Sequence, residues 1–157
     1  MYEYRCKVNR VVDGDTVDVD IDLGFNIVLT DERVRIMGID TPESRTSDEV
    51  EKVFGKAAKY RLMELLGDVA VLRTQVDKSG DDMKGKFGRI LGDFVAPDGR
   101  MVTEILIGEG YCVPYFGGSK EEVQAQHHAN RERLISEGKV TVDGKGKYHL
   151  VGDHHDE

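Results

Sequence analysis

An apolar segment that holds one arginine and runs into an acidic turn places the strongest limit on how this chain folds. Residues 34–43 read Val-Arg-Ile-Met-Gly-Ile-Asp-Thr-Pro-Glu. Nearly continuous Val, Ile and Met are typical of a strand buried on both faces, where an unpaired charge such as Arg35 is costly. Pro42 fixes its own φ angle and favours extended geometry in the residue before it, so the turn is stiff. The segment predicts a buried strand whose end holds Asp40 and Glu43 in place.

The arginine and the two acids have two interpretations from this segment alone. One is structural, a buried ion pair that closes the end of a strand. The other is functional, because an arginine that cannot lose its proton, beside two carboxylates on a rigid corner, is suited to metal-assisted phosphate chemistry. Other motifs of the chain bear on this choice.

A second pair of acids, Asp13 and Asp15, surrounds a glycine just before an alternating strand. In residues 17–23 the Val, Ile and Leu side chains share one face, and three aspartates share the other. Asp15 has the parity of the apolar face, so its carboxylate is expected at the mouth of the core. The three aspartates are expected in water, on a solvated strand face. This second motif favours the functional interpretation.

A basic motif opens the apolar run 90–95. Residues 86–89 read Lys-Phe-Gly-Arg, and the glycine lets a backbone or a ligand come close. By itself this motif is typical of a surface basic cluster. Taken together, Asp-Gly-Asp-Thr, then Arg followed by Asp-Thr-Pro-Glu, then Lys-Phe-Gly-Arg resemble the staphylococcal nuclease (thermonuclease) family in order and spacing. The resemblance extends over residues 4–138.

The resemblance implies an α+β, mainly β fold, in which a five-stranded OB-type barrel has three helices packed outside. The patterns of the chain agree with it. Periodicity, capping boxes and turn residues predict strands at 3–12, 15–23, 27–39, 69–76 and 87–95, and helices that begin at 46–49, 101 and 119 and end near 66, 109 and 136. The strand at 27–39 is expected to bend at residues 31–32.

The resemblance also implies a calcium-dependent endonuclease. Such an enzyme hydrolyses phosphodiester bonds of DNA and RNA with little sequence preference and leaves 3′-phosphate ends. The resemblance assigns direct calcium ligation to Asp15 and Asp40. The residue types agree, because oxygen ligands, here these two carboxylates and the carbonyl of Thr41, favour a hard cation such as Ca²⁺ or Mg²⁺ over zinc.

Three further residues receive catalytic roles from the same resemblance. Arg35 and Arg89 are expected to hold the scissile phosphate, and Glu43 to orient or deprotonate the attacking water. A phosphodiester is anionic and resists nucleophiles, so catalysis depends on positive charge placed where negative charge gathers in the transition state.

Lys86, Phe87 and Tyr115 are predicted to contact the substrate. The family position that corresponds to Phe87 is commonly a tyrosine whose hydroxyl reaches a substrate phosphate, and Phe87 keeps the ring without that bond. Tyr115 looks like one of the family's nucleotide-stacking tyrosines. An aromatic residue that caps the barrel is an equal alternative for Tyr115.

The net charge of −8, from 30 acidic and 22 basic residues, conflicts with a broad nucleic-acid-binding face. A bound cation and clustered bases can offset it locally. We therefore expect weak binding of DNA and RNA that depends on metal. A monomer and a preference for single-stranded or locally opened substrate are separate expectations. The alternative is a non-catalytic nuclease-like module that binds nucleic acid or protein. Degenerate modules lose the acids and arginines that this chain keeps.

Length and composition suggest one domain with a short tail. Residues 1–138 form the nuclease-like domain, and 139–157 form a polar tail that is either a short hairpin or disordered. No apolar run is long enough to span a membrane, and no secretory signal precedes the first strand, so a cytoplasmic location without a membrane partner is expected.

The cysteines and histidines are given no part in the chemistry. Cys6 and Cys112 are far apart and match no metal spacing, so they are expected to be buried thiols. None of the five histidines is expected to be catalytic. His127 and His128 are adjacent on a helix, so their side chains diverge and cannot share a metal.

Overall fold

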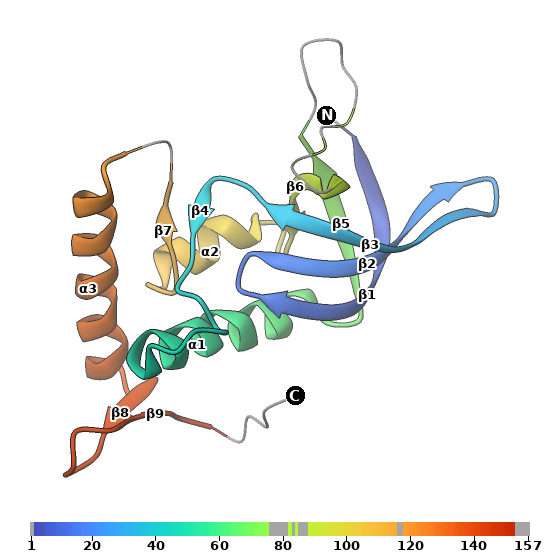
Figure 1. The fold of residues 1–157 in the computed structure, drawn as a ribbon. Coiled ribbons are helices and arrows are strands. Elements are labelled where there is room, and N and C mark those ends of the chain that lie inside the picture. Colours follow the sequence, from blue (N-terminus) through green and yellow to red (C-terminus); the bar gives the residue numbers. More distant parts are fainter. Residues whose placement is uncertain (1, 76–81, 83, 85–87, 116–117, 153–157) are drawn as a thin grey trace.

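Five strands close into a barrel that rests on helix α1, Glu49–Leu66 (Figure 1). The computed structural model describes residues 2–75, 82, 84, 88–115 and 118–152. Around the barrel the strand order is β1-β2-β3-β6-β5. These strands are β1 (Glu3–Asp13), β2 (Thr16–Gly24), β3 (Ile27–Ile36), β5 (Val69–Thr74) and β6 (Ile90–Val95).

Among the described residues, three helices and two small strand pairs lie outside the barrel, so the predicted α+β barrel with three outer helices is confirmed. The β4–β7 pair joins the segment after β3 to the segment before α3, and the β8–β9 hairpin follows α3. The bounds are α1 (Glu49–Leu66), α2 (Val102–Gly108), α3 (Lys120–Ser136), β4 (Ile39–Asp40), β7 (Val113–Pro114), β8 (Val140–Val142) and β9 (Tyr148–Leu150).

The barrel closes through one parallel pairing. All other neighbours in the ring are antiparallel, but β3 pairs in parallel with β6, so that Val34 lies opposite Ile90 and Arg35 opposite Leu91. A parallel pair needs a long connection between its strands, which the chain provides through α1 and β5. Arg89 therefore lies directly before β6, beside β3, instead of inside the predicted strand 87–95.

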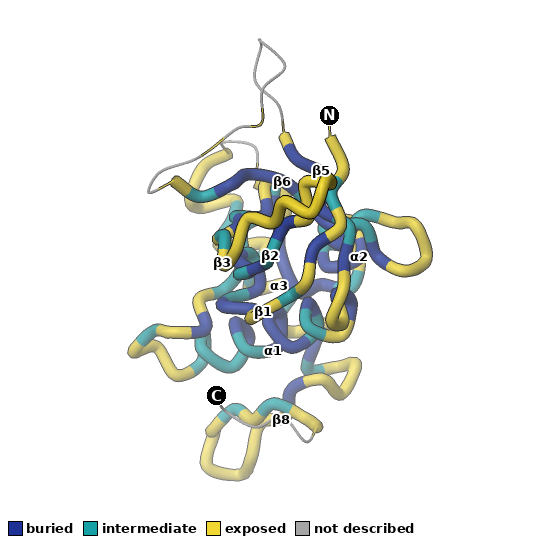
Figure 2. The backbone as a smooth tube through the Cα atoms, turned by 90° about the vertical axis from the view of Figure 1, so that its right-hand side faces the viewer, coloured by how far each residue is buried: buried dark blue, intermediate teal, exposed yellow. Residues whose placement is uncertain are grey.

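The inner face of β2 supplies much of the barrel core. Val17, Val19 and Ile21 are at most 2% exposed, as the alternation of the sequence predicts. Figure 2 shows the buried stretches of the barrel strands and of α1 at the centre of the molecule. On the outer face, Asp18 forms an ion pair with Arg33 at 2.8 Å. The prediction that this face is only solvated was wrong at Asp18, because the neighbouring strand brings a cation opposite it.

Two details of β3 depend on the backbone. The bend predicted at residues 31–32 is present, since Asp31 has a φ of 52° and its N–H donates to the Asp20 carboxylate at 2.8 Å. The predicted strand 27–39 is not continuous, however. Gly38 has a φ of 84°, a conformation that favours glycine, and it separates β3 from β4. Asp40 therefore belongs to a short strand outside the barrel.

The start of α1 also differs from the capping box expected at residues 46–49. Asp48 is the N-cap, and its carboxylate accepts hydrogen bonds from the N–H groups of Val50 and Glu51, at 3.1 Å each. An aspartate is as good a cap as the threonine two residues before it, and here Thr46 accepts a bond from the Asp48 N–H instead.

The segment after α3 forms a hairpin that packs against α1. Val140 is fully buried, and the Tyr148 ring lies 6.1 Å from the Phe54 ring in an edge-to-face arrangement. Of the two alternatives for the tail, the hairpin is present, whereas 153–157 lie outside the described residues. A domain boundary at residue 138 stays a prediction.

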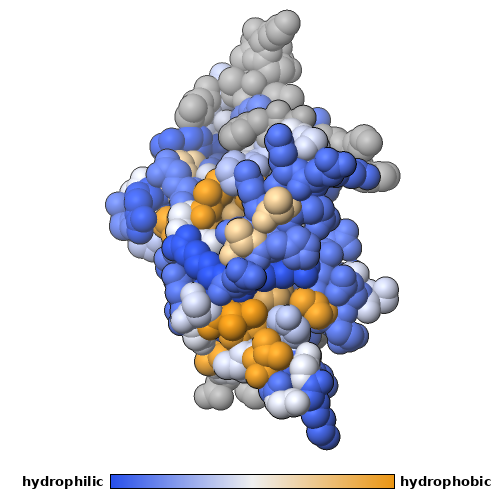
Figure 3. Space-filling model, turned by 90° about the vertical axis from the view of Figure 1, so that its left-hand side faces the viewer, coloured by the Kyte–Doolittle hydropathy of each residue, from blue (hydrophilic) through white to orange (hydrophobic). Residues whose placement is uncertain are grey.

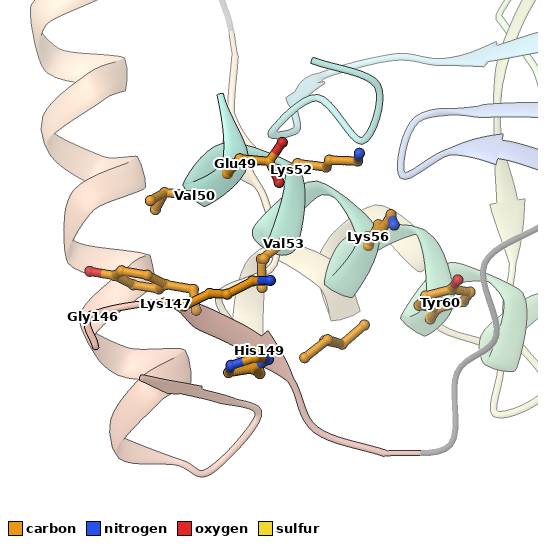
Figure 4. Close-up of a pocket in the computed structure, with 11 residues that line it drawn as sticks. Glu49, Val50, Lys52, Val53, Lys56, Tyr60, Gly146, Lys147 and His149 are labelled. Atoms are coloured by element: carbon orange, nitrogen blue, oxygen red, sulfur yellow. The ribbon is translucent and has the colours of Figure 1, made fainter. Parts of the chain in front are cut away.

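A groove of about 420 Å³ lies where the hairpin meets the first half of α1 (Figure 4). It is lined partly by Lys52 and Lys56 of α1 and by Lys147 and His149 of the hairpin. None of the predicted catalytic, metal or substrate residues lines this groove.

Both cysteines are buried free thiols, as expected. Burial raises the pKa of Cys6 to about 12. In the part of the chain that the structure describes, no helix is long and apolar enough to cross a membrane.

Candidate functional site

Two turns that carry predicted metal ligands meet over α1. At Gly14, between β1 and β2, an added β-carbon would lie 2.8 Å from the Ala58 β-carbon and 3.3 Å from the Thr41 methyl group. The Ser44 hydroxyl donates a hydrogen bond to the Asp13 carboxylate. Contact and hydrogen bond together join the 13–15 turn to the turn after β4, so Asp15 and Thr41 are held in one region.

The turn that carries Glu43 is fixed by one face of α1. The N–H of Glu43 donates to a carboxylate oxygen of Glu51 at 2.9 Å. One helical turn later, the backbone of Glu43 and Ser44 crosses Gly55, where it leaves no room for a side chain. The Glu43 side chain itself is exposed. The helix therefore positions the backbone of this turn and leaves the carboxylate open to solvent.

Arg35 and Asp15 lie together at the mouth of the barrel. An Arg35 terminal nitrogen is 3.4 Å from the Asp15 Oδ2 atom, and the Thr16 hydroxyl donates to Oδ1 at 2.9 Å. The guanidinium also donates to the carbonyl oxygens of Ile36 and Ile39. Because the Arg35 and Asp15 side chains keep 24% and 18% of their surface exposed, this pair can be reached from solvent.

Asp40 receives a contact that the sequence analysis missed. Its Oδ2 atom lies 2.6 Å from the Nε2 atom of His127 on α3. The Asp40 side chain is 43% exposed, whereas the His127 side chain is 11% exposed. A signal for this position was present, because His127 stands seven residues before the buried Leu134 and therefore shares its helix face.

The two predicted calcium ligands, Asp15 and Asp40, both act electrostatically on one buried group, the Cys112 thiol. Burial raises the pKa of the Cys112 thiol, and the carboxylates of Asp15, Asp40 and Asp93 raise it further. A cation beside them would be favoured by the same charge.

The donor chemistry fits a hard cation. Within the described residues, no group of three or more His, Cys, Asp or Glu side chains forms a metal cluster. Asp15 and Asp40 would therefore share the coordination of a cation with water, a backbone carbonyl or substrate oxygens. Calcium and magnesium accept such mixed oxygen ligands, whereas structural zinc sites are usually closed by four protein ligands.

Of the remaining predicted catalytic and substrate residues, some lie within the described part of the chain and some do not. Arg89 is partly exposed at the barrel end where Ile90 pairs with Val34. Lys86 and Phe87 lie outside the described residues.

Tyr115 is an exposed residue beside the break in β3. Its side chain is 48% exposed, and its N–H donates to the Gly38 carbonyl at 3.0 Å. It lines a hollow of about 430 Å³ together with Met37, Thr74 and Asp93. An exposed ring over a hollow is compatible with nucleotide stacking, and it does not decide against a barrel cap.

The surface around α3 is largely hydrophilic. In Figure 3 the hydrophobic areas on this face are small and are divided by hydrophilic side chains. Leu134 is the buried residue of α3, and most of its other side chains are exposed. One face of the helix is therefore exposed to solvent, and the other contacts the rest of the protein, as His127 does.

Comparisons with known proteins agree with this geometry. The profile of the family described as "Staphylococcal nuclease homologue" matches residues 33–141. The chain is 33% identical over 132 residues to the thermonuclease of Staphylococcus intermedius, which covers 81% of this chain and 72% of that protein.

Two proteins of Bacillus subtilis (strain 168) are also similar. The SPbeta prophage-derived endonuclease YokF is 35% identical over 142 residues, covering 90% of this chain and 44% of YokF. Endonuclease YhcR is 32% identical over 119 residues, covering 73% of this chain and 9% of YhcR. The chain thus spans less than half the length of either Bacillus protein.

Proposed function

The chain belongs to the staphylococcal nuclease family, and on this premise we propose that it is a calcium-dependent endonuclease that hydrolyses phosphodiester bonds of DNA and RNA. The observation that carries the proposal is the meeting of the 13–15 and 40–44 turns over α1, with Arg35 beside Asp15. Little sequence preference and 3′-phosphate products are part of the proposal.

Asp15, Asp40 and the Thr41 carbonyl would hold the calcium ion. When bound, the ion supplies positive charge next to the phosphate and helps to stabilise the charge of the transition state. Asp15 and Asp40 come from different turns, so binding of the ion depends on the fold that brings those turns together.

Arg35 and Arg89 hold the phosphate in the proposed reaction. A guanidinium can make two parallel hydrogen bonds to phosphate oxygens and stays charged at every relevant pH. Arg35 is already turned toward the mouth of the barrel by its contacts with Asp15 and two carbonyl groups. Substrate binding adds phosphate oxygens as acceptors for the same guanidinium.

Glu43 acts on the attacking water. Its exposed carboxylate orients the water or accepts its proton as the water oxygen bonds to phosphorus. As the bond from phosphorus to the 5′ oxygen breaks, the leaving 5′ oxygen takes up a proton from solvent, and the phosphate stays on the 3′ end. The fixed backbone of the turn supports this role, since a general base must be held within hydrogen-bond reach of its water.

Single-stranded or locally opened nucleic acid is the proposed substrate form. The exposed ring of Tyr115 offers a stacking surface, and an unpaired base presents both of its faces. Substrate contact by Lys86 and Phe87, a monomeric state and a cytoplasmic location stay predictions from the sequence.

Cleavage of oligonucleotides labelled with a fluorophore and a quencher tests the proposal. DNA and RNA are each incubated with calcium, magnesium or a chelator, and the product ends are tested for a 3′-phosphate. Cleavage is expected with calcium and should stop with chelator. Asp40→Ala should abolish it, whereas Asp22→Asn, on an exposed stretch of β2, should not.

Two outcomes would contradict the proposal. Full activity of Asp40→Ala in chelator would exclude the metal site. Metal-independent binding of the oligonucleotides without cleavage under any of these conditions would favour the non-catalytic module instead.

A further inference from the structure

A histidine of the last helix holds the carboxylate of Asp40. His127 lies 87 positions after Asp40 in the chain, yet its Nε2 atom is 2.6 Å from Asp40 Oδ2. An ionised carboxylate can only accept hydrogen bonds, so the Nε2 nitrogen carries the proton in this contact. The bond uses one of the two carboxylate oxygens, and a cation can be bound by the other.

The same face of α3 fixes the position of His127. Asn130 donates from Nδ2 to the Cys112 carbonyl at 3.2 Å. The Arg131 guanidinium lies 5.4 Å from the centre of an aromatic ring of α1, and Leu134 is 2% exposed. These residues follow His127 at the third, fourth and seventh positions, so they share one helix face. The docking of this face therefore holds the backbone of His127 beside Asp40.

The other predicted calcium ligand is oriented in a different way. Asp15 receives its hydrogen bond from Thr16, its neighbour in sequence, and its ion pair from Arg35 of the adjacent strand. Both of these partners belong to the barrel. Asp40 lies on β4, outside the barrel, and its carboxylate is the more exposed of the two. The orientation of the Asp40 carboxylate therefore depends more on a partner from another part of the chain.

We propose that His127 is a positioning residue for the calcium site: its Nε2–H group holds the Asp40 carboxylate in the orientation that binds the cation. This inference rests on the proposed function, in which Asp40 is a calcium ligand. Hydrogen bonds from outside the coordination shell fix the orientation of ligating groups, and their loss lowers metal affinity about 10–100-fold. His127 acts through Asp40 and touches neither the substrate nor the cation.

Calcium affinity of the full chain, measured by isothermal titration calorimetry without nucleic acid, tests this inference. In His127→Leu the side chain stays apolar and of similar bulk but cannot donate, so the dissociation constant for calcium should rise about 10–100-fold. His127→Gln restores an N–H donor and should recover part of the affinity. His128→Ala changes the exposed neighbour on the same helix and should bind calcium as the unchanged protein does.

Cleavage provides a second readout. The calcium concentration that gives half the maximal rate should rise in His127→Leu by the same factor as the dissociation constant. Circular dichroism and thermal unfolding show whether each variant is folded. His127→Met, a second side chain that cannot donate, replaces His127→Leu if leucine disturbs the docking of α3.

The outcomes separate this inference from the proposed function. If the unchanged protein binds no calcium, both fail. If it binds calcium and cuts, and the folded non-donating variants bind calcium equally well, only the role of His127 fails. Tighter calcium binding in these variants would also overturn it, because His127 would then compete with the cation for Asp40.

Discussion

Gly55 of α1 lies so close to Glu43 that a β-carbon at this position would stand 2.3 Å from the Glu43 carbonyl oxygen. Backbone atoms, not the end of a flexible side chain, form this contact. The turn with the predicted general base therefore rests directly on the helix. Helix and turn can keep this distance only while position 55 has no side chain.

Gly55→Ala should consequently lower both activity and stability. Alanine normally stabilises a helix by about 0.5–1 kcal/mol relative to glycine, but overpacking against fixed atoms costs about 1–3 kcal/mol. We expect a net loss in the free energy of unfolding and a lower kcat, because Glu43 is displaced. Gly108→Ala is the matched control, since a β-carbon at that helical glycine would meet no atom within 4 Å apart from its chain neighbours and its own helix backbone. If the two variants had equal free energies of unfolding and equal kcat values, the backbone at Gly55 and Glu43 would be able to move apart without an energetic cost.

Glu51 should affect cleavage although it is given no chemical role. Its carboxylate accepts the N–H of Glu43 at 2.9 Å. Glu51→Ala frees that N–H and loosens the turn, so kcat should fall, while the calcium dissociation constant changes little. Glu49→Ala removes an exposed acid from the same helical turn and serves as the control. Equal kcat values for the two variants would exclude a role of this hydrogen bond in holding Glu43.

Arg35 should act mainly on the transition state. Arginines that stabilise phosphoryl transfer are worth about 10³–10⁵ in rate, so Arg35→Ala should lower kcat far more than it weakens oligonucleotide binding. Arg35→Lys should recover little, because an ammonium group cannot make the paired contacts of a guanidinium. The same comparison applies to Arg89→Ala. A kcat within threefold of the unchanged protein would assign the altered arginine a structural role.

Asp93 should make stability fall as the pH rises. Burial raises the pKa of this carboxyl above its ordinary value of 3.8, although Thr103 and the Phe94 N–H donate to it. The folded state then holds the proton more tightly than the unfolded state does. The stability that the Asp93 carboxyl contributes is therefore fully present below pH 3.8 and is lost as the pH rises through the native pKa.

Asp93→Asn removes this titration. Measured by denaturant unfolding, its free energy of unfolding relative to the unchanged protein should increase from acid to neutral pH. Asp98→Asn should show the opposite trend, because the hydrogen bond from Arg100 lowers the pKa of the exposed Asp98 carboxyl. If the free energy of unfolding of Asp93→Asn relative to the unchanged protein did not vary with pH, burial would not be raising the pKa of Asp93.

The sequence predicted the barrel well because its signals are local. Alternation in β2 identified the buried face, and Ser119 caps α3 as its capping box indicates. The strand through residues 27–39 was wrong at Gly38, because an apolar run gives no sign of a backbone that leaves the sheet. The N-cap of α1 was misplaced because several neighbouring residues can cap equally well.

The candidate site was only partly accessible from sequence. Motif spacing predicted the acids and arginines, and the structure brings Asp15 and Arg35 together, while the roles assigned to these residues stay predictions. The contact of His127 with Asp40 was missed. The spacing of His127 from Leu134 indicates the inner face of α3, but no local pattern pairs it with a residue 87 positions earlier. The closeness of Gly55 to Glu43 was missed for a similar reason, because a glycine inside a helix gives no sign of what lies against it.

The parallel pairing of β3 with β6 determines when, during synthesis, the barrel can close. A ribosome releases Asp15, Arg35 and Asp40 long before Ile90, the residue with which β6 begins. Until that strand has emerged, β3 lacks its partner and the ring of strands is open. The growing polypeptide therefore carries its predicted calcium ligands in an open sheet until β6 has been synthesised and closes the barrel.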